Sequence, residues 1–197
     1  MSSDSNEKFR TWGYALRNSD REAFAELFDE TYDSLHRYAA YFTRDGDVAA
    51  DILQDVYLKL WNVRDTIDPE KSLRAFMYQM VRNYSLNHQR QVKRHRSEEL
   101  DAEHPSVSYD SLNEEQLDAT ALGERIHRWI DDMPTRRREA FMLSRYEGLS
   151  HDEIAAMMDL APKTVNNHIV LALQHIREKL DAYRDEPSDT EASERNA

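Results

Sequence analysis

Ser150-His-Asp-Glu-Ile-Ala-Ala-Met-Met-Asp-Leu-Ala-Pro-Lys-Thr-Val-Asn-Asn-His-Ile169 is the stretch that most strongly constrains the fold. Ser150, followed three residues later by Glu153, forms a capping-box pattern, which predicts that a helix begins here. Pro162 favours the first turn of a second helix. Between them Leu160 is expected to fill a short turn, so the stretch predicts a helix-turn-helix. In such a unit the second helix places side chains on base edges in the DNA major groove.

The second helix is expected to run from Pro162 to about Tyr183. Its buried stripe is predicted to comprise Val165, Ile169, Leu173, Ile176 and Leu180. Asn and Gln side chains pair with adenine, and Lys reaches guanine or phosphate. The residues expected to contact DNA are therefore Lys163, Thr164, Asn166, Asn167 and His168. An ordinary helical hairpin with a solvated polar face remains the alternative, which the apolar Val170 and Leu171 favour.

Three consecutive arginines, Arg136 to Arg138, stand near the start of the preceding helix. Positive charge at a helix N-terminus opposes the helix dipole slightly, and this cost favours a functional role for the arginines. Arg136 and Arg137 are expected to hold DNA phosphates beside the recognition helix. A solvated helix end is the alternative interpretation.

The composition predicts an all-α protein. The sequence of 197 residues has four glycines, five prolines and no cysteine. Without cysteine it has neither disulfides nor thiolate metal sites, which fits a reducing cytoplasm. No apolar run approaches a membrane span, and the N-terminus does not resemble a signal peptide. No catalytic constellation, metal site or cofactor-binding motif stands out, so the chain is expected not to be an enzyme.

Helical periodicity and charge divide the chain into five segments. The predicted fold is two small helical domains joined by a flexible acidic linker, with the helix-turn-helix in the second domain. Another capping-box pattern, Ser19 to Glu22, is expected to open the first domain. The segments are a polar N-terminal tail (1–19), the first domain (20–94), the linker (95–121), the second domain (122–183) and a disordered acidic tail (184–197).

Charge is distributed in blocks. The net charge is −12, yet residues 73–96 contain six basic residues and no acidic one. Residues 97–118 contain eight acidic residues and no basic one. A basic helix that also carries aromatic side chains suits single-stranded nucleic acid, because cations follow the backbone and bases stack on rings. The alternative is that Phe76 and Tyr84 belong to the core, as aromatic residues at helical spacing usually do.

A further helix, within residues 47–61, has a polar and apolar outer face. Surface carboxylates beside apolar side chains suit the docking of a basic helix from a partner protein. A solvated helix face is the alternative. The residues of this expected docking patch are Asp51, Gln54, Asp55, Leu58 and Trp61.

Four motifs in order resemble the extracytoplasmic-function sigma factors, small members of the sigma-70 family of bacterial RNA polymerase. Asp20-Arg-Glu-Ala-Phe24-Ala-Glu-Leu-Phe28 resembles the opening of the family's first domain. Ala50-Asp-Ile-Leu-Gln-Asp-Val-Tyr-Leu-Lys-Leu-Trp61 resembles the segment that docks on the polymerase, and Phe76 to Arg94 the segment that captures the −10 element. Met133-Pro-Thr-Arg-Arg-Arg-Glu-Ala-Phe141 with Tyr146 to His168 resembles the domain that reads the −35 element.

The resemblance implies a role for each set of residues. Asp51, Gln54, Asp55, Leu58 and Trp61 would contact core RNA polymerase. For the −10 element, Asn83 and Tyr84 would lie at or near the loop that holds a flipped base, and Arg82, Arg90 and Arg94 would hold phosphates. The −35 element would be contacted by Arg136, Arg137, Lys163, Thr164, Asn166, Asn167 and His168.

The resemblance also implies a function: a sigma factor that directs transcription initiation by binding core polymerase and recognising the −10 and −35 elements. Its expected partners are core RNA polymerase and promoter DNA, with an anti-sigma factor as a further candidate and no small-molecule substrate, cofactor or membrane insertion. Two alternatives remain open from the residues: a stand-alone helix-turn-helix regulator, and a protein-interaction module that acts as a decoy.

Overall fold

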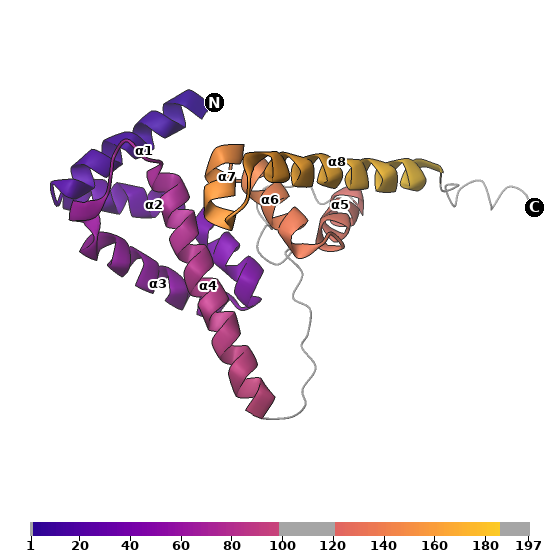
Figure 1. The fold of residues 1–197 in the computed structure, drawn as a ribbon, viewed down its shortest axis with the longest axis horizontal. Helices are drawn as coiled ribbons and strands as arrows, with labels where there is room; N and C mark the ends of the chain where they lie inside the picture. Colours follow the sequence, from indigo (N-terminus) through magenta and orange to yellow (C-terminus); the bar gives the residue numbers. More distant parts are fainter. Residues whose placement is uncertain (1, 99–120, 186–197) are drawn as a thin grey trace, which may run out of the picture.

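The computed structural model describes residues 2–98 and 121–185, and within these ranges it consists of helices and their connections, without strands (Figure 1). The elements are α1 (Ser2–Arg17), α2 (Arg21–Thr43), α3 (Gly46–Asn62), the 3₁₀ helix η1 (Arg64–Thr66), α4 (Leu73–Glu98), α5 (Ala121–Asp131), α6 (Thr135–Arg145), α7 (His151–Met158) and α8 (Pro162–Asp185). The all-α prediction is confirmed.

The boundaries expected for the linker and the C-terminal tail shift. Residues 95–98 continue α4, and Ala121 begins α5, so both ends of the expected linker are helical. Helix α8 likewise continues to Asp185. The remaining residues of the two segments, 99–120 and 186–197, lie outside the described residues.

The expected N-terminal tail is a helix instead. Phe9, Trp12 and Leu16 of α1 are buried in the main core, with Leu16 fully inaccessible. The indole N–H of Trp12 donates to Oε2 of Glu26 at 3.3 Å, which ties α1 to α2. The prediction of a polar tail was wrong because three apolar residues at helical spacing suffice to anchor an otherwise polar helix.

Helices α2, α3 and α4 form the centre of the first group of helices, and α1 covers one side of it. The inward face of α3 is apolar, and Leu53, Val56 and Leu60 have no accessible surface. The capping box expected at Ser19 does not form. Instead the Asp20 carboxylate accepts from the backbone N–H groups of Glu22 and Ala23, which satisfies donors that a helix start leaves free.

Helices α5 to α8 form the second group. Val165 and Ile169 of α8 are buried as predicted, but Leu173 is 41% exposed and Ala172 is buried in its place. A spacing of seven residues from Val165 to Ala172 stays closer to one helical face than a spacing of eight does, since a turn has 3.6 residues. Leu173 therefore lies beside the stripe and not within it.

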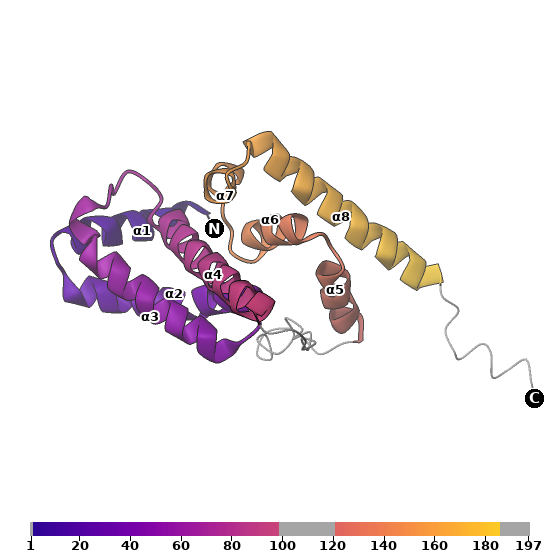
Figure 2. The ribbon, with the colours of Figure 1, turned by 60° about the horizontal axis from the view of Figure 1, so that its bottom comes forward.

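The two groups pack against each other. Helix α4 of the first group contacts α7 of the second, and the two lie side by side in Figures 1 and 2. One apolar cluster spans this contact and includes Met77 and Met80 of α4 together with Ile154, Met157 and Met158 of α7. The described residues thus share a continuous core, while the C-terminal part of α4 projects away from it (Figure 1).

Candidate nucleic-acid interface

The helix-turn-helix is present as predicted. Ser150 caps α7: its hydroxyl accepts from the backbone N–H of Glu153, and the Glu153 carboxylate accepts from the backbone N–H of Ser150 at 2.7 Å. Asp159 ends α7 in the left-handed conformation (φ 54°), and Leu160 then packs on the core before α8 begins. These local interactions fix the entry of α8.

The first turns of α8 carry the polar residues expected to read DNA. Lys163, Asn166 and Asn167 are exposed, while Thr164 and His168 are half-buried at the edge of the same surface. Burial lowers the pKa of His168, and the nearby guanidinium groups of Arg137 and Arg136 lower it further. The structure thus places Arg136 and Arg137 of α6 close to His168 of α8, as one surface.

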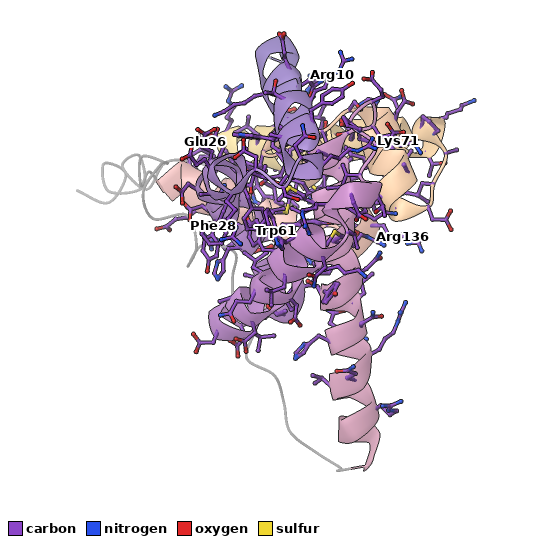
Figure 3. The ribbon with its side chains drawn as sticks, turned by 90° about the vertical axis from the view of Figure 1, so that its left-hand side faces the viewer. Arg10, Glu26, Phe28, Trp61, Lys71 and Arg136 are labelled. Carbon is purple, nitrogen blue, oxygen red and sulfur yellow. The ribbon has the colours of Figure 1, made fainter. Side chains whose placement is uncertain are left out.

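The three arginines of α6 have different environments. Arg136 is exposed (Figure 3), and Arg137 is half-buried, with a buried Nε atom that has no hydrogen-bond partner. Arg138 is engaged elsewhere: its Nη1 atom donates to the Asp131 carboxylate at 2.9 Å, and its guanidinium lies over the Tyr41 ring. Two of the three arginines are therefore available beside α8 for an anion.

Helix α4 presents a second polar surface. Asn83, Asn87, Arg90 and Arg94 lie on the solvent side of the helix, and Nη1 of Arg90 donates to the Asn87 side chain at 3.0 Å. Phe76 lies seven residues before Asn83, so the two share a helix face, and its ring is 37% exposed. The alternative that placed Phe76 in the core does not hold, and its ring is accessible for stacking.

Two residues expected on the α4 surface have other surroundings. Tyr84 is half-buried and packs against the core, and with Asn83 it lies within a continuous helix, away from any loop. The Nε atom of Arg82 donates to Oε1 of Glu139 at 2.7 Å, across the contact between the two groups. Arg82 therefore does not face solvent together with Asn83 and Arg90.

The expected docking patch lies on the outer face of α3. Asp51, Gln54 and Asp55 are exposed, Leu58 is 63% exposed, and Trp61 is half-buried. Leu58 and Trp61 also line an apolar cavity of about 380 Å³. The structure therefore joins the predicted carboxylates and apolar residues in one surface.

The cavity has a second wall, on α2, that the sequence interpretation missed. Arg21, Phe24 and Phe28 contribute this wall, and Phe28 is 37% exposed. Phe28 and Trp61 lie near each other on one face of the molecule (Figure 3). The missed signal is the run of aromatic residues on α2, which is wider than a single buried stripe requires.

Two negative findings concern the described residues. No cluster of three or more His, Asp or Glu side chains able to hold a metal ion occurs among them. Within the same ranges, none of the helices combines the length and the apolar character that crossing a membrane requires.

Comparison with protein families identifies both groups of helices. A family model described as Sigma-70 region 2 matches residues 27–95, and one described as Sigma-70, region 4 matches residues 123–176. The two ranges together cover more than half of the chain. The first contains the docking patch and the α4 surface, and the second contains the helix-turn-helix.

Curated relatives match over most of their length. The chain is 25% identical over 175 residues to the ECF RNA polymerase sigma factor SigK of Mycobacterium ulcerans, covering 85% of this chain and 90% of the relative. It is 26% identical over 173 residues to the ECF RNA polymerase sigma-E factor of Escherichia coli K12, covering 84% and 90%.

Solved structures share the fold. One is CnrH in complex with the cytosolic domain of CnrY (TM-score 0.64, 21% identity, 89% of this chain and 98% of that chain). Another is the sigma factor RpoE of Bartonella quintana in complex with the anti-sigma factor NepR (TM-score 0.62, 21% identity, 80% and 96%).

Proposed function

The chain belongs to the sigma-70 family, as an extracytoplasmic-function sigma factor, and from this we propose how its surfaces divide the work of promoter recognition. It directs transcription initiation as a specificity subunit of RNA polymerase. The observation that carries the proposal is that two separate polar helix surfaces, on α4 and α8, accompany a distinct apolar and acidic surface on α3. Helices α1–α4 form the first functional domain, and α5–α8 form the second.

The second domain reads the −35 element through α8. Asn166 and Asn167 are exposed near the helix start, where a recognition helix contacts base edges, and an amide side chain pairs bidentately with adenine. Lys163, Thr164 and His168 flank these amides. Arg136 and Arg137 hold the adjacent phosphates, which fixes the register of the helix without reading sequence.

The first domain holds the −10 element through α4. Asn83 reads an unstacked base edge, and the cations Arg90 and Arg94 follow the backbone. Arg82 joins them once it is released from Glu139. Tyr84 supports this face from the core side, since its ring is half-buried.

The α3 surface binds core RNA polymerase. Exposed carboxylates of Asp51 and Asp55 beside the apolar Leu58 and Trp61 suit a partner helix that carries basic and apolar residues. Gln54, also exposed on this helix, adds a neutral hydrogen-bonding group beside the two carboxylates. The cavity between α2 and α3 offers a pocket in which an apolar anchor of the partner loses its water, and such pockets carry much of the binding energy of interfaces.

An Asp55→Lys exchange tests the assignment of this surface. The new cation repels a basic partner helix, so the affinity for core polymerase is expected to fall by on the order of a hundredfold, which corresponds to about 2.7 kcal/mol. Asp181→Lys is the matched control, because it makes the same charge change at an exposed position on α8. Equal affinity of the two variants for core polymerase, measured by titration, would remove α3 from the polymerase interface.

Binding to DNA separates this function from the alternatives. A sigma factor recognises a promoter together with core polymerase, whereas a stand-alone helix-turn-helix regulator binds a palindromic site unaided, usually as a dimer. A decoy binds protein partners and protects no DNA. Footprinting on genomic fragments is expected to show protection of two separated elements with core polymerase present. Protection of a palindrome by the protein alone would favour the regulator.

The proposed cellular location follows from the proposed partners. Polymerase and promoter DNA are cytoplasmic in bacteria, so we assign the chain to the cytoplasm. It acts there as an initiation factor, while the chemistry of RNA synthesis belongs to the polymerase. An anti-sigma protein is a further proposed partner, since one solved structure of similar fold contains a sigma factor bound to an anti-sigma factor.

A further inference from the structure

The contact between the two groups of helices buries charged groups as well as apolar ones. Glu139 of α6 is 2% exposed, and its carboxylate Oε1 accepts from the Arg82 guanidinium at 2.7 Å and from the Tyr38 hydroxyl at 2.9 Å. Both partners belong to the first group. A carboxylate removed from water needs hydrogen-bond partners, and residues of the other domain supply them to Glu139.

A second carboxylate repeats this arrangement. The Tyr78 hydroxyl of α4 donates to Oε2 of Glu147, which follows α6 and is 5% exposed. Arg37 and Arg74 of the first group also act on Glu147 electrostatically. Gly148 makes the local geometry possible: its φ of +62° lies in the region that glycine favours, and it lets the chain turn directly after Glu147.

We propose that Glu139 and Glu147 form a latch that keeps the two domains closed and withholds Arg82 from DNA. The proposal rests on the proposed function, because Arg82 is assigned there to the −10 surface. Asn83 and Arg90 on the same helix remain exposed in this closed arrangement, so Arg82 is the residue of that surface that the latch occupies.

The buried ion pair in this contact is compatible with reversible opening of the two domains. Buried ion pairs gain little over the same charges in water, because desolvation offsets their attraction, so separating the domains returns both charges to solvent at small net cost. The contact is nevertheless specific, since breaking one side leaves a buried charge without its partner. Opening the domains also exposes the apolar cluster that α4 and α7 share, so binding of α3 to core polymerase has to offset this loss of burial before Arg82 can reach a phosphate.

Distance measurement tests closure directly. The sequence contains no cysteine, so Asp47→Cys on α3 and Asp181→Cys on α8 provide two unique spin-label sites at exposed positions, one in each domain. In the free full-length chain we expect one narrow distance distribution. With Glu139→Gln and Glu147→Gln added, the distribution is expected to broaden towards longer distances. Asp132→Asn, which removes one exposed carboxylate of the same domain, is expected to leave it unchanged.

Binding of a short fluorescein-labelled single-stranded oligonucleotide tests the consequence. The Glu139→Gln/Glu147→Gln variant of the free chain is expected to bind on the order of tenfold more tightly than the wild type, within the usual range of coupling between two sites. A control with Asp132→Asn and Asp181→Asn removes the same number of negative charges at exposed positions of the same domain. Adding Arg82→Gln to the latch variant is expected to remove most of the gain, because Arg82 is the cation that opening releases.

A milder variant tests whether the effect of the latch variant comes from general loss of structure. Tyr38→Phe with Tyr78→Phe keeps both rings and both carboxylates but removes the two hydroxyl donors, and it is expected to change distance and affinity in the same direction by less. Unchanged distances in both latch variants would overturn the proposal. Longer distances with unchanged affinity for the oligonucleotide would overturn the role given to Arg82.

In these experiments the latch and the proposed function can fail separately. None of them uses polymerase, so latch variants that open as expected, in a protein that supports no promoter-specific transcription, would contradict the proposed function and leave the latch intact. A chain that supports such transcription while its latch variants keep the wild-type distance would contradict the latch alone.

Discussion

At the scale of single residues, two leucines of α3 have different roles: one is expected to stabilise the fold, and the other to contribute to binding. Leu53 is fully buried and Leu58 is 63% exposed, although they stand five positions apart. Leu53→Ala is expected to lower the free energy of unfolding by about 2–5 kcal/mol, because it removes buried methyl groups and leaves a cavity. Leu58→Ala is expected to change it by less than about 0.5 kcal/mol.

The same pair tests the docking patch. Leu58→Ala is expected to weaken binding to core polymerase while the protein stays as stable as the wild type. Chemical denaturation measures the stability of both variants, and titration with core polymerase measures the affinity of Leu58→Ala. A stable Leu58→Ala variant with undiminished affinity would show that the cavity between α2 and α3 has another purpose.

Glu147 is expected to make stability depend on pH. Burial raises the pKa of its carboxyl above the ordinary value of 4.5, against the opposing effects of Tyr78, Arg37 and Arg74. A raised pKa in the folded state means that the folded protein holds this proton more tightly than the unfolded chain does. The contribution is therefore fully present below pH 4.5 and is lost as the pH rises through the folded pKa.

Thermal unfolding across that pH range provides the measurement. The altered contact with Tyr78 offsets the stability of Glu147→Gln by an amount that does not depend on pH. On top of this offset, the wild type is expected to lose stability relative to Glu147→Gln as the pH rises above 4.5, because the glutamine has no proton to release. Asp132→Asn, at an exposed position, is the matched control and should follow the wild type. Parallel stability curves for wild type and Glu147→Gln would contradict the raised pKa.

Individual positions show where sequence periodicity stops being informative. Lys163, Asn166 and Asn167 could be assigned to the exposed face of α8 because one helix carries both the polar face and the stripe opposite it. Arg82 and Phe28 could not be placed in this way. Whether each is exposed depends on a neighbour distant in sequence, Glu139 in one case and the opposite wall of the α2–α3 cavity in the other.

At the scale of elements, the capping box of α7 is expected to contribute to both fold and function. Ser150→Ala removes the hydroxyl that accepts from the Glu153 N–H, and loss of such a cap costs about 1 kcal/mol. Thermal or chemical unfolding measures this change. Ser144→Ala, within α6, is the control and should have a smaller effect, since alanine is favourable inside a helix. Equal destabilisation by both changes would contradict the role of the cap.

The surface of α4 makes a prediction about salt. Arg90→Gln removes one phosphate contact to the unstacked −10 strand, so the slope of log affinity against log salt for polymerase-bound protein on promoter DNA should become shallower by about 0.7, the value for single strands. Arg17→Gln, an exposed arginine at the end of α1, should leave the slope unchanged. A slope that Arg90→Gln does not alter would exclude Arg90 from the phosphate contacts.

Elements with strong local signals were predictable, and those that depend on tertiary contacts were not. Ser150, Pro162 and the buried positions of α8 specify the helix-turn-helix through local hydrogen bonds and period. Helix α1 escaped prediction because its polar residues outnumber Phe9, Trp12 and Leu16, whose burial requires the surface of the other helices. The prediction that Ser19 and Glu22 form a capping box was likewise wrong, because the adjacent Asp20 caps α2 instead.

At the scale of the whole molecule, two properties matter: the uneven distribution of charge, and the packing of the two groups of helices against each other. The chain has a net charge of −12, yet its α4 and α8 surfaces carry amides and cations. Division into two helical groups was predictable from the acidic block between them. Their packing was not, because it depends on pairs such as Tyr38 with Glu139, separated by 101 residues, which no local pattern encodes.

The central claim is that this chain gives core RNA polymerase its promoter specificity, and transcription from genomic fragments in vitro tests it most directly. With core polymerase and wild-type protein we predict transcripts that start at discrete positions, and none of these starts with core polymerase alone. The Asp55→Lys variant should lose these starts, and the Asp181→Lys control should keep them. Failure of the wild-type protein to produce any discrete start across the genomic fragments would contradict the account.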